Sequence, residues 1–482
     1  MQTKQKQTKK KHLMKEGYIK KEDRKKILLL TDDIRVHSGV AQIGREMVLH
    51  TSHRYNWIQL AGAINHPDKG KVLDVSEDTN KTMGIEDSSV KLYPTDGYGS
   101  PELLRHIINI EKPDAIFLIT DPRYFTWVFQ MENEIRKRIP IVYLNIWDDL
   151  PAPAYNKEFY ESCDALLGIS KQTVNINKIV LGDAGKNKII KYVPHGLNNK
   201  MFFPIDEKHE QFENLKKFKL QLTQNKEYDF ILLFNSRNIR RKSIPDAILA
   251  WRLFTDQLPK EKAEKCLFIL HTQPVDDNGT DLPAVIEYIC PKDTCKIFIS
   301  PNRLETVDMN LLYNCADGVI LLSSNEGWGL ALTEALLTGT PIIANVTGGM
   351  QDQMRFIDNE GKWFTPDPNI PSNHKGTYKK HGEWAFPVFP SNSSLIGSVP
   401  TPYIFDDRCQ PEHAAEKIME LYNLNKEKRK EIGLKGMEWV TGDEAGFTSE
   451  KMSNRIIEAL DELFLTWKPR EKYEFLKDTD FE

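Results

Sequence analysis

The sequence predicts an α/β protein built from two Rossmann-like, doubly wound domains, and three observations lead to this prediction. The chain has 482 residues, which is too long for one compact core and long enough for two domains of roughly 200 residues each. Short apolar runs bounded by turn residues alternate with stretches of helical period, which is the pattern of βαβ units and a mainly parallel sheet. A polar, lysine-rich stretch near residues 205–225 interrupts this alternation, so a domain boundary is expected there.

The first domain is predicted to span residues 25–205. Segments such as VAQIGREMVLH and SPELLRHIINIEK have apolar residues at every third or fourth position and are therefore expected to be helices between the strands. The predicted strands are Ile27–Leu30, Trp57–Leu60, Val90–Tyr93, Ala115–Ile119, Ile141–Asn145, Ala165–Ile169 and Ile189–Val193.

The second domain is predicted to span residues 225–445 and to face the first across a cleft. Its strands are expected in DFILLFNS, CLFILHTQP, CKIFIS, DGVILLSS and TPIIANV, again separated by helical patterns. Residues 357–409 are rich in Pro, Gly, Ser and Asn but contain several aromatic residues, so we expect a folded functional excursion that lines the cleft. Amphipathic helices follow, and the last, at 446–470, is expected to cross back and brace the first domain.

Residues 1–24 are lysine-rich and are predicted to form a solvated tail. The alternative is a weak electrostatic contact of this tail with an anionic surface, either acidic lipid or nucleic acid. The formal net charge of the whole chain is −4, which excludes a general basic field of the kind that holds proteins on nucleic acid.

The six cysteines include no CxxC pair, and several lie in apolar stretches, so buried thiols are expected rather than disulfides or structural zinc. No apolar run approaches the roughly 18 residues that span a bilayer, and the N-terminus lacks the apolar core of a signal peptide. A cytoplasmic location is therefore expected.

The segment NEGWGLALTEALLTG contains the main candidate site residues: Glu326, Gly327, Gly329, Leu330 and Glu334. It joins the predicted strand DGVILLSS to a helix, and ligands of open α/β sheets bind beyond the carboxyl ends of such strands. The glycines would let the backbone approach a ligand, and amides near Leu330 would donate to its oxygens. Two carboxylates there would suit a polyol. The alternative is a glutamate favoured by the helix dipole beside a second, surface glutamate.

A second group of candidates lies in FNSRNIRRKSIPDAILAW, where Arg237 ends a strand and Lys242 precedes a helix. Two cations at the mouth of a sheet would neutralise a diphosphate. The alternative is an exposed basic helix start, and we expect that description to hold for Arg240 and Arg241 but not for Arg237 and Lys242.

Gly39 follows the first strand and opens the first helix, where a small residue makes room for a phosphate or an acceptor. Nearby His37 is either a ligand contact or a solvated loop residue. His195 lies between a proline and a glycine in VPHGLNN, so it is expected to be structural.

Together these motifs resemble the family 4 retaining glycosyltransferases of GT-B fold, whose C-terminal domain has an E-x7-E motif followed by a GG turn. The matching residues are Glu326, Gly327, Trp328, Gly329, Leu330, Glu334, Ala335, Gly339, Thr340, Pro341, Gly348 and Gly349. Arg237 and Lys242 match the two cations of the family's GR and KG motif, with Ser236 and Ser243 in place of the usual glycines. Residues 357–409 are the main part without a match.

The resemblance implies transfer of a hexosyl unit from a nucleoside diphosphate sugar to an acceptor hydroxyl, with retention at the anomeric carbon. Glu326 would contact the sugar, Glu334 the ribose, and Arg237 and Lys242 the diphosphate. No cofactor and no metal are expected. Alternatives are a sugar-nucleotide epimerase of the same architecture and a non-catalytic binding module. The acceptor stays open between glycan, lipid carrier, protein and modified nucleic acid.

Many relatives place a histidine after a central strand of the first domain, but this chain reads IVYLNIWDDLPAPAY there. Asp148 or Asp149 is therefore the candidate catalytic group that orients the acceptor hydroxyl. The alternative is an N-cap and turn before Pro151.

Overall fold

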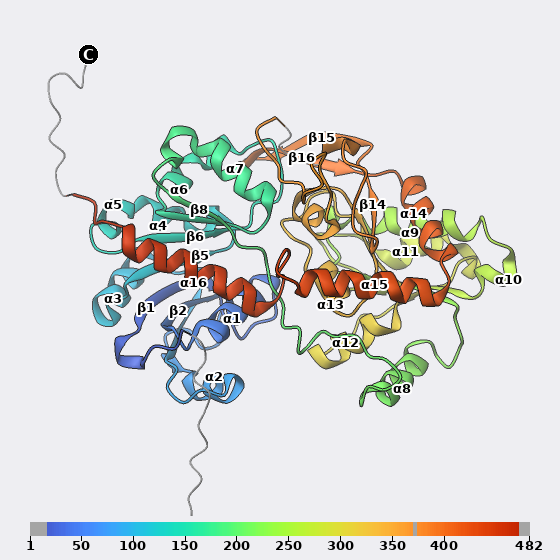
Figure 1. The fold of residues 1–482 in the computed structure, drawn as a ribbon, viewed down its shortest axis with the longest axis horizontal. Helices are drawn as coiled ribbons and strands as arrows, with labels where there is room; N and C mark the ends of the chain where they lie inside the picture. Colours follow the sequence, from blue (N-terminus) through green and yellow to red (C-terminus); the bar gives the residue numbers. More distant parts are fainter. Residues whose placement is uncertain (1–16, 370–373, 472–482) are drawn as a thin grey trace, which may run out of the picture.

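Two parallel β-sheets with flanking helices form two α/β domains, which face each other across a cleft (Figure 1). The structure is a computed structural model that describes residues 17–369 and 374–471. It confirms the predicted fold class. The domain limits at residues 205 and 225 stay predictions.

The first sheet has the strand order β3-β4-β2-β1-β5-β6-β7-β8, and only the β3–β4 pair is antiparallel. Its strands are β1 Lys25–Asp32, β2 Tyr55–Ala63, β3 Leu73–Asp74, β4 Val90–Asp96, β5 Ala115–Ile119, β6 Ile141–Asn145, β7 Ala165–Gly168 and β8 Ile189–Tyr192. All seven predicted strands are present. The sequence missed β3, a two-residue edge strand too short to show a period. Strand order reverses on either side of β1, which is where a doubly wound sheet opens a crevice for ligands.

The second sheet has the order β11-β10-β9-β12-β13-β14, and all of its strands are parallel. Its strands are β9 Phe230–Asn235, β10 Cys266–His271, β11 Ile297–Ile299, β12 Gly318–Leu321, β13 Ile342–Asn345 and β14 Ala385–Val388. The reversal of strand order here lies at β9 and β12. Both sheets therefore place a crevice at the carboxyl ends of their central strands.

Helices connect these strands, and their starts carry recognisable capping residues. Ser38, Ser100 and Ser170 each accept a hydrogen bond from the backbone amide three residues later, which satisfies a donor at the helix start. The helices are α1 Gly39–Thr51, α2 Ser76–Met83, α3 Pro101–Glu111, α4 Thr126–Gln130, α5 Glu132–Ile135, α6 Lys157–Glu161, α7 Lys171–Leu181, α8 Phe212–Leu222, α9 Ile244–Thr255, α10 Lys260–Ala263, α11 Leu282–Ile289, α12 Thr306–Cys315, α13 Leu330–Leu337, α14 Pro411–Asn423, α15 Lys426–Thr441 and α16 Ser449–Thr466.

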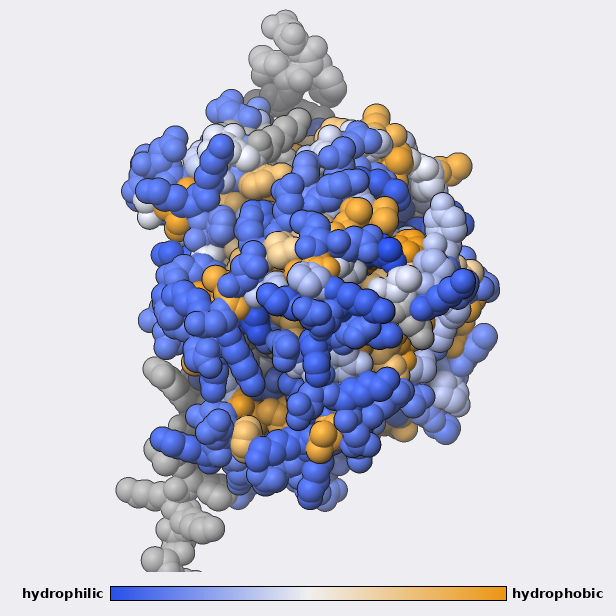
Figure 2. All heavy atoms as spheres, turned by 90° about the vertical axis from the view of Figure 1, so that its right-hand side faces the viewer, coloured by the Kyte–Doolittle hydropathy of each residue, from blue (hydrophilic) through white to orange (hydrophobic). Residues whose placement is uncertain are grey.

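The side chains of the central strand β1 alternate between the two faces of the first sheet. On β1, Ile27 and Leu29 pack into one hydrophobic cluster, whereas Leu28 and Leu30 pack into a second cluster on the other face of the sheet. The first cluster continues into the second domain. Figure 2 shows that the outer face of the second domain is mainly hydrophilic, with hydrophobic residues in small groups. No helix in the described part of the chain is long and apolar enough to cross a membrane.

Helix α16 crosses back from the second domain and lies along the first, as expected for a bracing helix (Figure 1). Its Asp461 accepts hydrogen bonds from Arg54 at 2.6 Å and from the Tyr55 hydroxyl at 3.1 Å. Where the chain returns, the Leu197 amide donates to the Phe447 carbonyl at 3.1 Å, and the Ser449 amide donates to the Leu197 carbonyl at 2.9 Å. The two crossings between the domains are therefore hydrogen-bonded to each other.

The excursion at 357–409 is folded and supplies three strands that the sequence did not predict. Strand β14, AFPV, forms one edge of the second sheet. Its proline is compatible with this position, because proline is tolerated at sheet edges. Strands β15 Asn392–Ser398 and β16 Thr401–Arg408 form an antiparallel hairpin, which we call the hairpin arm (residues 392–408). It was missed because β15 is mostly polar and exposed.

Residues 17–24 pack on the first domain, so the tail predicted over residues 1–24 is too long. Arg24 is buried, donates to the Ile19 carbonyl at 2.7 Å and pairs with Asp87 at 2.7 Å. The Tyr18 hydroxyl also donates to Asp87, at 2.6 Å. Residues 1–16, which carry the predicted contact with anionic surfaces, lie outside the described residues.

The expectation of unpaired thiols was wrong for one pair of cysteines. Cys290 and Cys295 are joined by a disulfide, with their Cα atoms 5.6 Å apart across the turn between α11 and β11. The CxxC pattern does not cover this pair, because the turn brings together two cysteines that are five positions apart. The other described cysteines are buried thiols.

Candidate active site

A cavity of about 600 Å³ lies between the domains, at the carboxyl ends of the strands of both sheets. The first domain contributes the segments after β1, β5 and β6 to its walls, and the second domain contributes the segments after β9 and β12. Of the predicted site residues, it is lined by Gly39, Asp148, Arg237, Lys242, Glu326, Gly327, Gly329, Leu330 and Glu334. Folding thus gathers residues that are up to 295 positions apart in the sequence, from Gly39 to Glu334.

Two helices begin at this cavity, one from each domain. Helix α1 starts at Gly39 and α13 starts at Leu330, and a methyl group added at Gly39 would lie 3.2 Å from the Leu330 side chain. The two helix starts therefore approach closely at Gly39, and a larger residue there would require the Leu330 side chain to shift. Gly329, with φ of 85°, sets the entry into α13 in a conformation that other residues rarely adopt. Unpaired amides and dipoles at both helix starts make the cavity suitable for an anion.

Glu326 lies in this cavity with two cations. Arg241 Nη1 is 2.9 Å from Glu326 Oε2, and Lys242 Nζ also binds Oε2. Burial would raise the pKa of Glu326, but Arg241 and Lys242 lower it to about 2, so the carboxylate is ionised. Since both cations bind Oε2, Oε1 has no hydrogen-bond partner within the described residues and is left for a ligand.

Arg241 was wrongly expected to be only an exposed base. The short helical turn Arg240–Lys242 leaves Arg240 exposed but directs Arg241 toward Glu326 and the Asn325 carbonyl, at 2.9 Å from each. Arg237, which we expected on the diphosphate, lines the cavity with a largely exposed side chain that pairs with Asp276 at 2.8 Å. The two cations that bind Glu326 directly are thus Arg241 and Lys242.

Ser243, which stands where the resembling family usually has a glycine, has a left-handed backbone conformation. Its φ and ψ of 50° and 40° are left-handed, a region that a residue with a side chain enters at a cost of roughly 1 kcal/mol. Serine therefore adopts a conformation that favours glycine, and it occupies the N-cap position of α9 without a capping hydrogen bond from its side chain.

Glu334 projects from the first turns of α13 into the same cavity. The Tyr313 hydroxyl donates to Glu334 Oε2 at 2.6 Å, and Asn235 Nδ2 donates to it at 3.4 Å. Burial raises the pKa of Glu334 to about 7, although both hydrogen bonds act in the opposite direction. Oε1 again lacks a partner among residues 17–369 and 374–471. The contacts of Tyr313 and Asn235 with Glu334 could not be predicted from the sequence, because these residues come from α12 and β9 and are distant from Glu334 in the chain.

The glycines around Glu326 allow loops of the two domains to touch. A methyl group on Gly327 would lie 2.7 Å from the Ile146 carbonyl oxygen. One on Gly348, in the GG turn, would lie 2.0 Å from the Glu326 carbonyl oxygen and 2.8 Å from that of Asp148. Larger residues at either position would force the walls of the cavity apart.

The structure separates the two first-domain candidates. Asp148 lines the cavity, where burial raises the pKa of its carboxyl, Arg241 lowers it and Glu326 raises it. Asp149 does not reach the cavity. It is fully buried and accepts hydrogen bonds from the Leu150 amide at 2.8 Å and from Gln172 at 3.0 Å. These contacts fit the turn alternative for Asp149, and its catalytic role stays a prediction that its position away from the cavity does not favour.

The two histidines considered from the sequence differ in position. His37 is exposed and does not line the cavity. His195 does line it, which corrects the expectation that it only fixes a turn. Its ring packs against Trp328 at 6.3 Å between centroids, burial lowers its pKa to about 3, and its Nδ1 has no partner among the described residues. His195 is therefore a neutral imidazole at the wall of the cavity.

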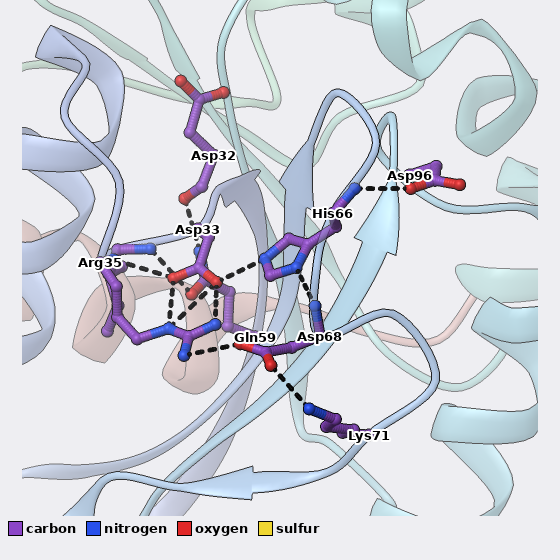
Figure 3. Close-up of polar contacts among 9 residues, drawn as sticks. Asp32, Asp33, Arg35, Gln59, His66, Asp68, Lys71 and Asp96 are labelled. Atoms are coloured by element: carbon purple, nitrogen blue, oxygen red, sulfur yellow. Dashed lines mark hydrogen bonds and ion pairs between the residues drawn. The ribbon is translucent and has the colours of Figure 1, made fainter.

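A second buried carboxylate cluster lies in the first domain, around Asp33 (Figure 3). Arg35 binds both oxygens of Asp33, at 3.0 Å from Oδ1 and 2.6 Å from Oδ2, and His66 Nε2 lies 2.8 Å from Oδ2. Asp68 and Asp96 hold Arg35 and His66 from the other side. Both oxygens of Asp33 are occupied, and none of these residues lines the cavity.

In residues 17–369 and 374–471, no group of three His, Cys, Asp or Glu side chains is arranged to hold a metal ion. The absence of a metal requirement stays a prediction.

Comparisons with known proteins agree with this architecture. A family model described as "Glycosyl transferases group 1" matches residues 293–372, which include Glu326, Glu334 and the GG turn. An alpha-monoglucosyldiacylglycerol synthase from Acholeplasma laidlawii is 27% identical over 188 residues, which make up 39% of this chain and 43% of that protein. The match thus spans less than half of that relative.

Solved structures are similar over nearly the whole chain. Anabaena HepE in complex with UDP and glucose has a TM-score of 0.61 at 16% identity, covering 91% of this chain and 100% of that one. Sucrose-phosphate synthase from Thermosynechococcus elongatus has a TM-score of 0.63 at 14% identity, covering 92% and 100%. At such low identity these likenesses establish the fold, and the chain has the GT-B architecture.

Proposed function

We propose that this protein is a glycosyltransferase that moves a hexosyl unit from a nucleoside diphosphate sugar to an acceptor hydroxyl, with retention at the anomeric carbon. The observation that carries the proposal is the interdomain cavity itself. It joins two carboxylates that each have one unused oxygen, Glu326 and Glu334, to the cations Arg241 and Lys242 and to two helix starts.

Each part of the donor has a matching group. The two helix starts and Lys242 would hold the diphosphate and stabilise the charge that it gains as the bond from phosphate oxygen to anomeric carbon breaks. Oε1 of Glu326 would accept a hydrogen bond from a sugar hydroxyl, and Oε1 of Glu334 from a ribose hydroxyl. For Lys242, Glu326 and Glu334 these assignments follow the roles implied by the family resemblance. Arg237 would contribute to the diphosphate site from its exposed position, and Arg241 would hold Glu326 in place.

Two carboxylates of the first domain, Asp121 and Asp148, line the cavity. Asp121 is paired with Arg123, so we propose that Asp148 orients the acceptor hydroxyl. His195 forms part of the same wall as a neutral ring. No cofactor or metal is included in this scheme. The membership in family 4, the retention and the cytoplasmic location are also parts of the proposal.

The test begins with the donor. UDP-glucose is the first compound to use, because UDP and glucose are bound in the HepE structure. Isothermal calorimetry should detect its binding, with ADP-glucose and GDP-glucose as comparison donors. Release of UDP should then depend on an acceptor, drawn from glycan, lipid, protein and DNA panels, and NMR of the product should show the donor's anomeric configuration.

Three outcomes would contradict the proposal. Epimerisation of the donor without any acceptor would favour an isomerase. Donor binding without release of UDP across all acceptors would favour a binding module. An inverted product would retain the transferase but remove the retaining mechanism.

A further inference from the structure

We propose that the hairpin arm is a positioning element, which fixes Asp148 of the first domain relative to Glu326 of the second. The inference depends on the proposed function, in which these two residues act on acceptor and donor. It gives a role to the hairpin arm, which lies outside residues 293–372, the part of the chain matched by the family model.

The backbone of Phe405 joins the two loops directly. Its amide donates to the Leu150 carbonyl at 2.7 Å, two residues after Asp148. Its carbonyl accepts from Asn325 Nδ2 at 3.3 Å, and Asn325 immediately precedes Glu326. One residue of β16 thus bridges the acceptor wall and the donor wall of the cavity.

Neighbouring residues of β16 strengthen the attachment to the first domain. The Tyr155 hydroxyl donates to the Tyr403 carbonyl at 2.8 Å, the Ala154 amide donates to the Tyr403 hydroxyl at 3.1 Å, and the two tyrosine rings meet edge to face at 4.8 Å. Arg123 also donates to Thr401. Figure 1 shows β15 and β16 at the boundary between the domains.

On the side of the second domain, Asp407 anchors the arm. Its amide donates to the Ser324 carbonyl at 2.9 Å, and its carbonyl accepts from Asn345 at 2.7 Å. The Thr347 hydroxyl lies 2.8 Å from Asp407 Oδ2 and 3.1 Å from Asp149 Oδ2. Burial and the nearby carboxylate of Asp407 raise the pKa of Asp149 well above its usual range, so Thr347 lies between two closely placed carboxyl groups, one from each domain.

The second domain therefore contacts four of the five residues 146–150. Gly327 packs on the Ile146 carbonyl and Gly348 on the Asp148 carbonyl, while Thr347 contacts Asp149 and Phe405 binds Leu150. A misplacement of about 1 Å in a reacting group can lower a rate by roughly 100-fold. Contacts at several positions would therefore preserve the rate by keeping Asp148 in place. Donor-binding groups all lie outside this segment.

The test uses the full chain with Tyr403→Ala, which removes the ring contact and the side-chain hydrogen bond. Val399→Ala, at the 97% exposed tip of the same hairpin, is the matched control. Tyr155→Phe removes only the hydrogen bond to the Tyr403 carbonyl and serves if Tyr403→Ala does not fold. Three quantities are measured: hydrogen exchange of residues 146–155 without ligand, donor affinity, and kcat.

We expect Tyr403→Ala to accelerate exchange in residues 146–155 and to lower kcat roughly tenfold, with donor affinity changed by no more than about twofold. Val399→Ala should match the wild type in all three. Unchanged exchange, unchanged kcat, or a parallel loss of donor affinity would each overturn the proposal. If the wild type transfers no sugar while exchange still rises in Tyr403→Ala, the proposed function fails and the arm remains the element that orders residues 146–150.

Discussion

Asp33 and Glu326 are both buried carboxylates held by two cationic or imidazole side chains, yet their oxygens are used differently. At Asp33, Arg35 and His66 occupy both oxygens (Figure 3). At Glu326, Arg241 and Lys242 both bind Oε2, and Oε1 stays unpaired within the described residues beside the cavity. A saturated cluster stabilises the fold, whereas an unused oxygen at a cavity indicates a binding site.

The strongest test of this contrast is Glu326→Gln. We expect kcat to fall roughly 100- to 1,000-fold, because the substitution removes a charge that would be aligned with the reacting sugar in a site of low dielectric. Steady-state kinetics with saturating donor would measure it, with a thermal melt to confirm folding. A variant that keeps more than about a tenth of the wild-type kcat would show that Oε1 does not act on the sugar.

The next effect concerns Glu334, whose pKa near 7 makes donor binding depend on pH. Below pH 7 the carboxyl is protonated and is a poorer acceptor for ribose hydroxyls, so donor affinity should rise as the pH increases from 6 to 8. In Glu334→Gln the affinity should be lower, roughly tenfold at pH 8, and this part of the pH dependence should disappear. Calorimetry at several pH values measures both. An identical pH profile in the variant would exclude the ribose role.

In contrast to the variants of Glu326 and Glu334, Asp33→Asn should lower the stability of the fold without lowering kcat or donor affinity. We expect a loss of about 2–3 kcal/mol in the free energy of unfolding at pH 7, since Arg35 and His66 lose a buried anionic partner. Donor affinity and kcat per folded molecule should match the wild type. Denaturant titrations and kinetics on the same samples would test this, and a selective loss of kcat would break the distinction between the two clusters.

The same variant has a predicted pH dependence. Burial would raise the pKa of Asp33, but its bonds to Arg35 and His66 lower it below the usual 3.8. A carboxylate with a lowered pKa stabilises the fold above its unfolded pKa and loses that contribution as the pH falls through the folded value. The stability difference between wild type and Asp33→Asn should therefore be complete above pH 4 and shrink below it.

Arg237→Gln should have the smallest effect. This side chain is 62% exposed and already pairs with Asp276, so solvent screening limits its contribution to donor binding. A weakening of about two- to threefold in donor affinity is expected, against a much larger loss for Lys242→Gln, whose side chain is only 9% exposed. Equal losses in the two variants would show that Arg237 turns inward when the donor binds.

The sequence predicted those features that arise from local patterns. Alternating apolar runs located most strands of both sheets, and the motifs predicted that Glu326, Glu334 and Lys242, which line the same cavity, belong to one site. Side chains that approach from distant elements carry no such pattern. Tyr313 on Glu334, the inward turn of Arg241 and the buried position of Asp149 depend on tertiary packing. The hairpin arm was missed because its strands are polar and gain their structure from contacts with both domains.

The paired crossings at Leu197 and Thr448 also constrain how the cleft can open. The chain passes between the domains along two adjacent segments, joined by the hydrogen bonds of Leu197 to Phe447 and Ser449. Gly196 has no room for a side chain, because a methyl group would lie 2.2 Å from the Thr448 carbonyl oxygen. Two adjacent, hydrogen-bonded segments restrict the relative movement of the domains more than a single connecting segment would, so the crossing itself helps to keep the two walls of the cavity in register.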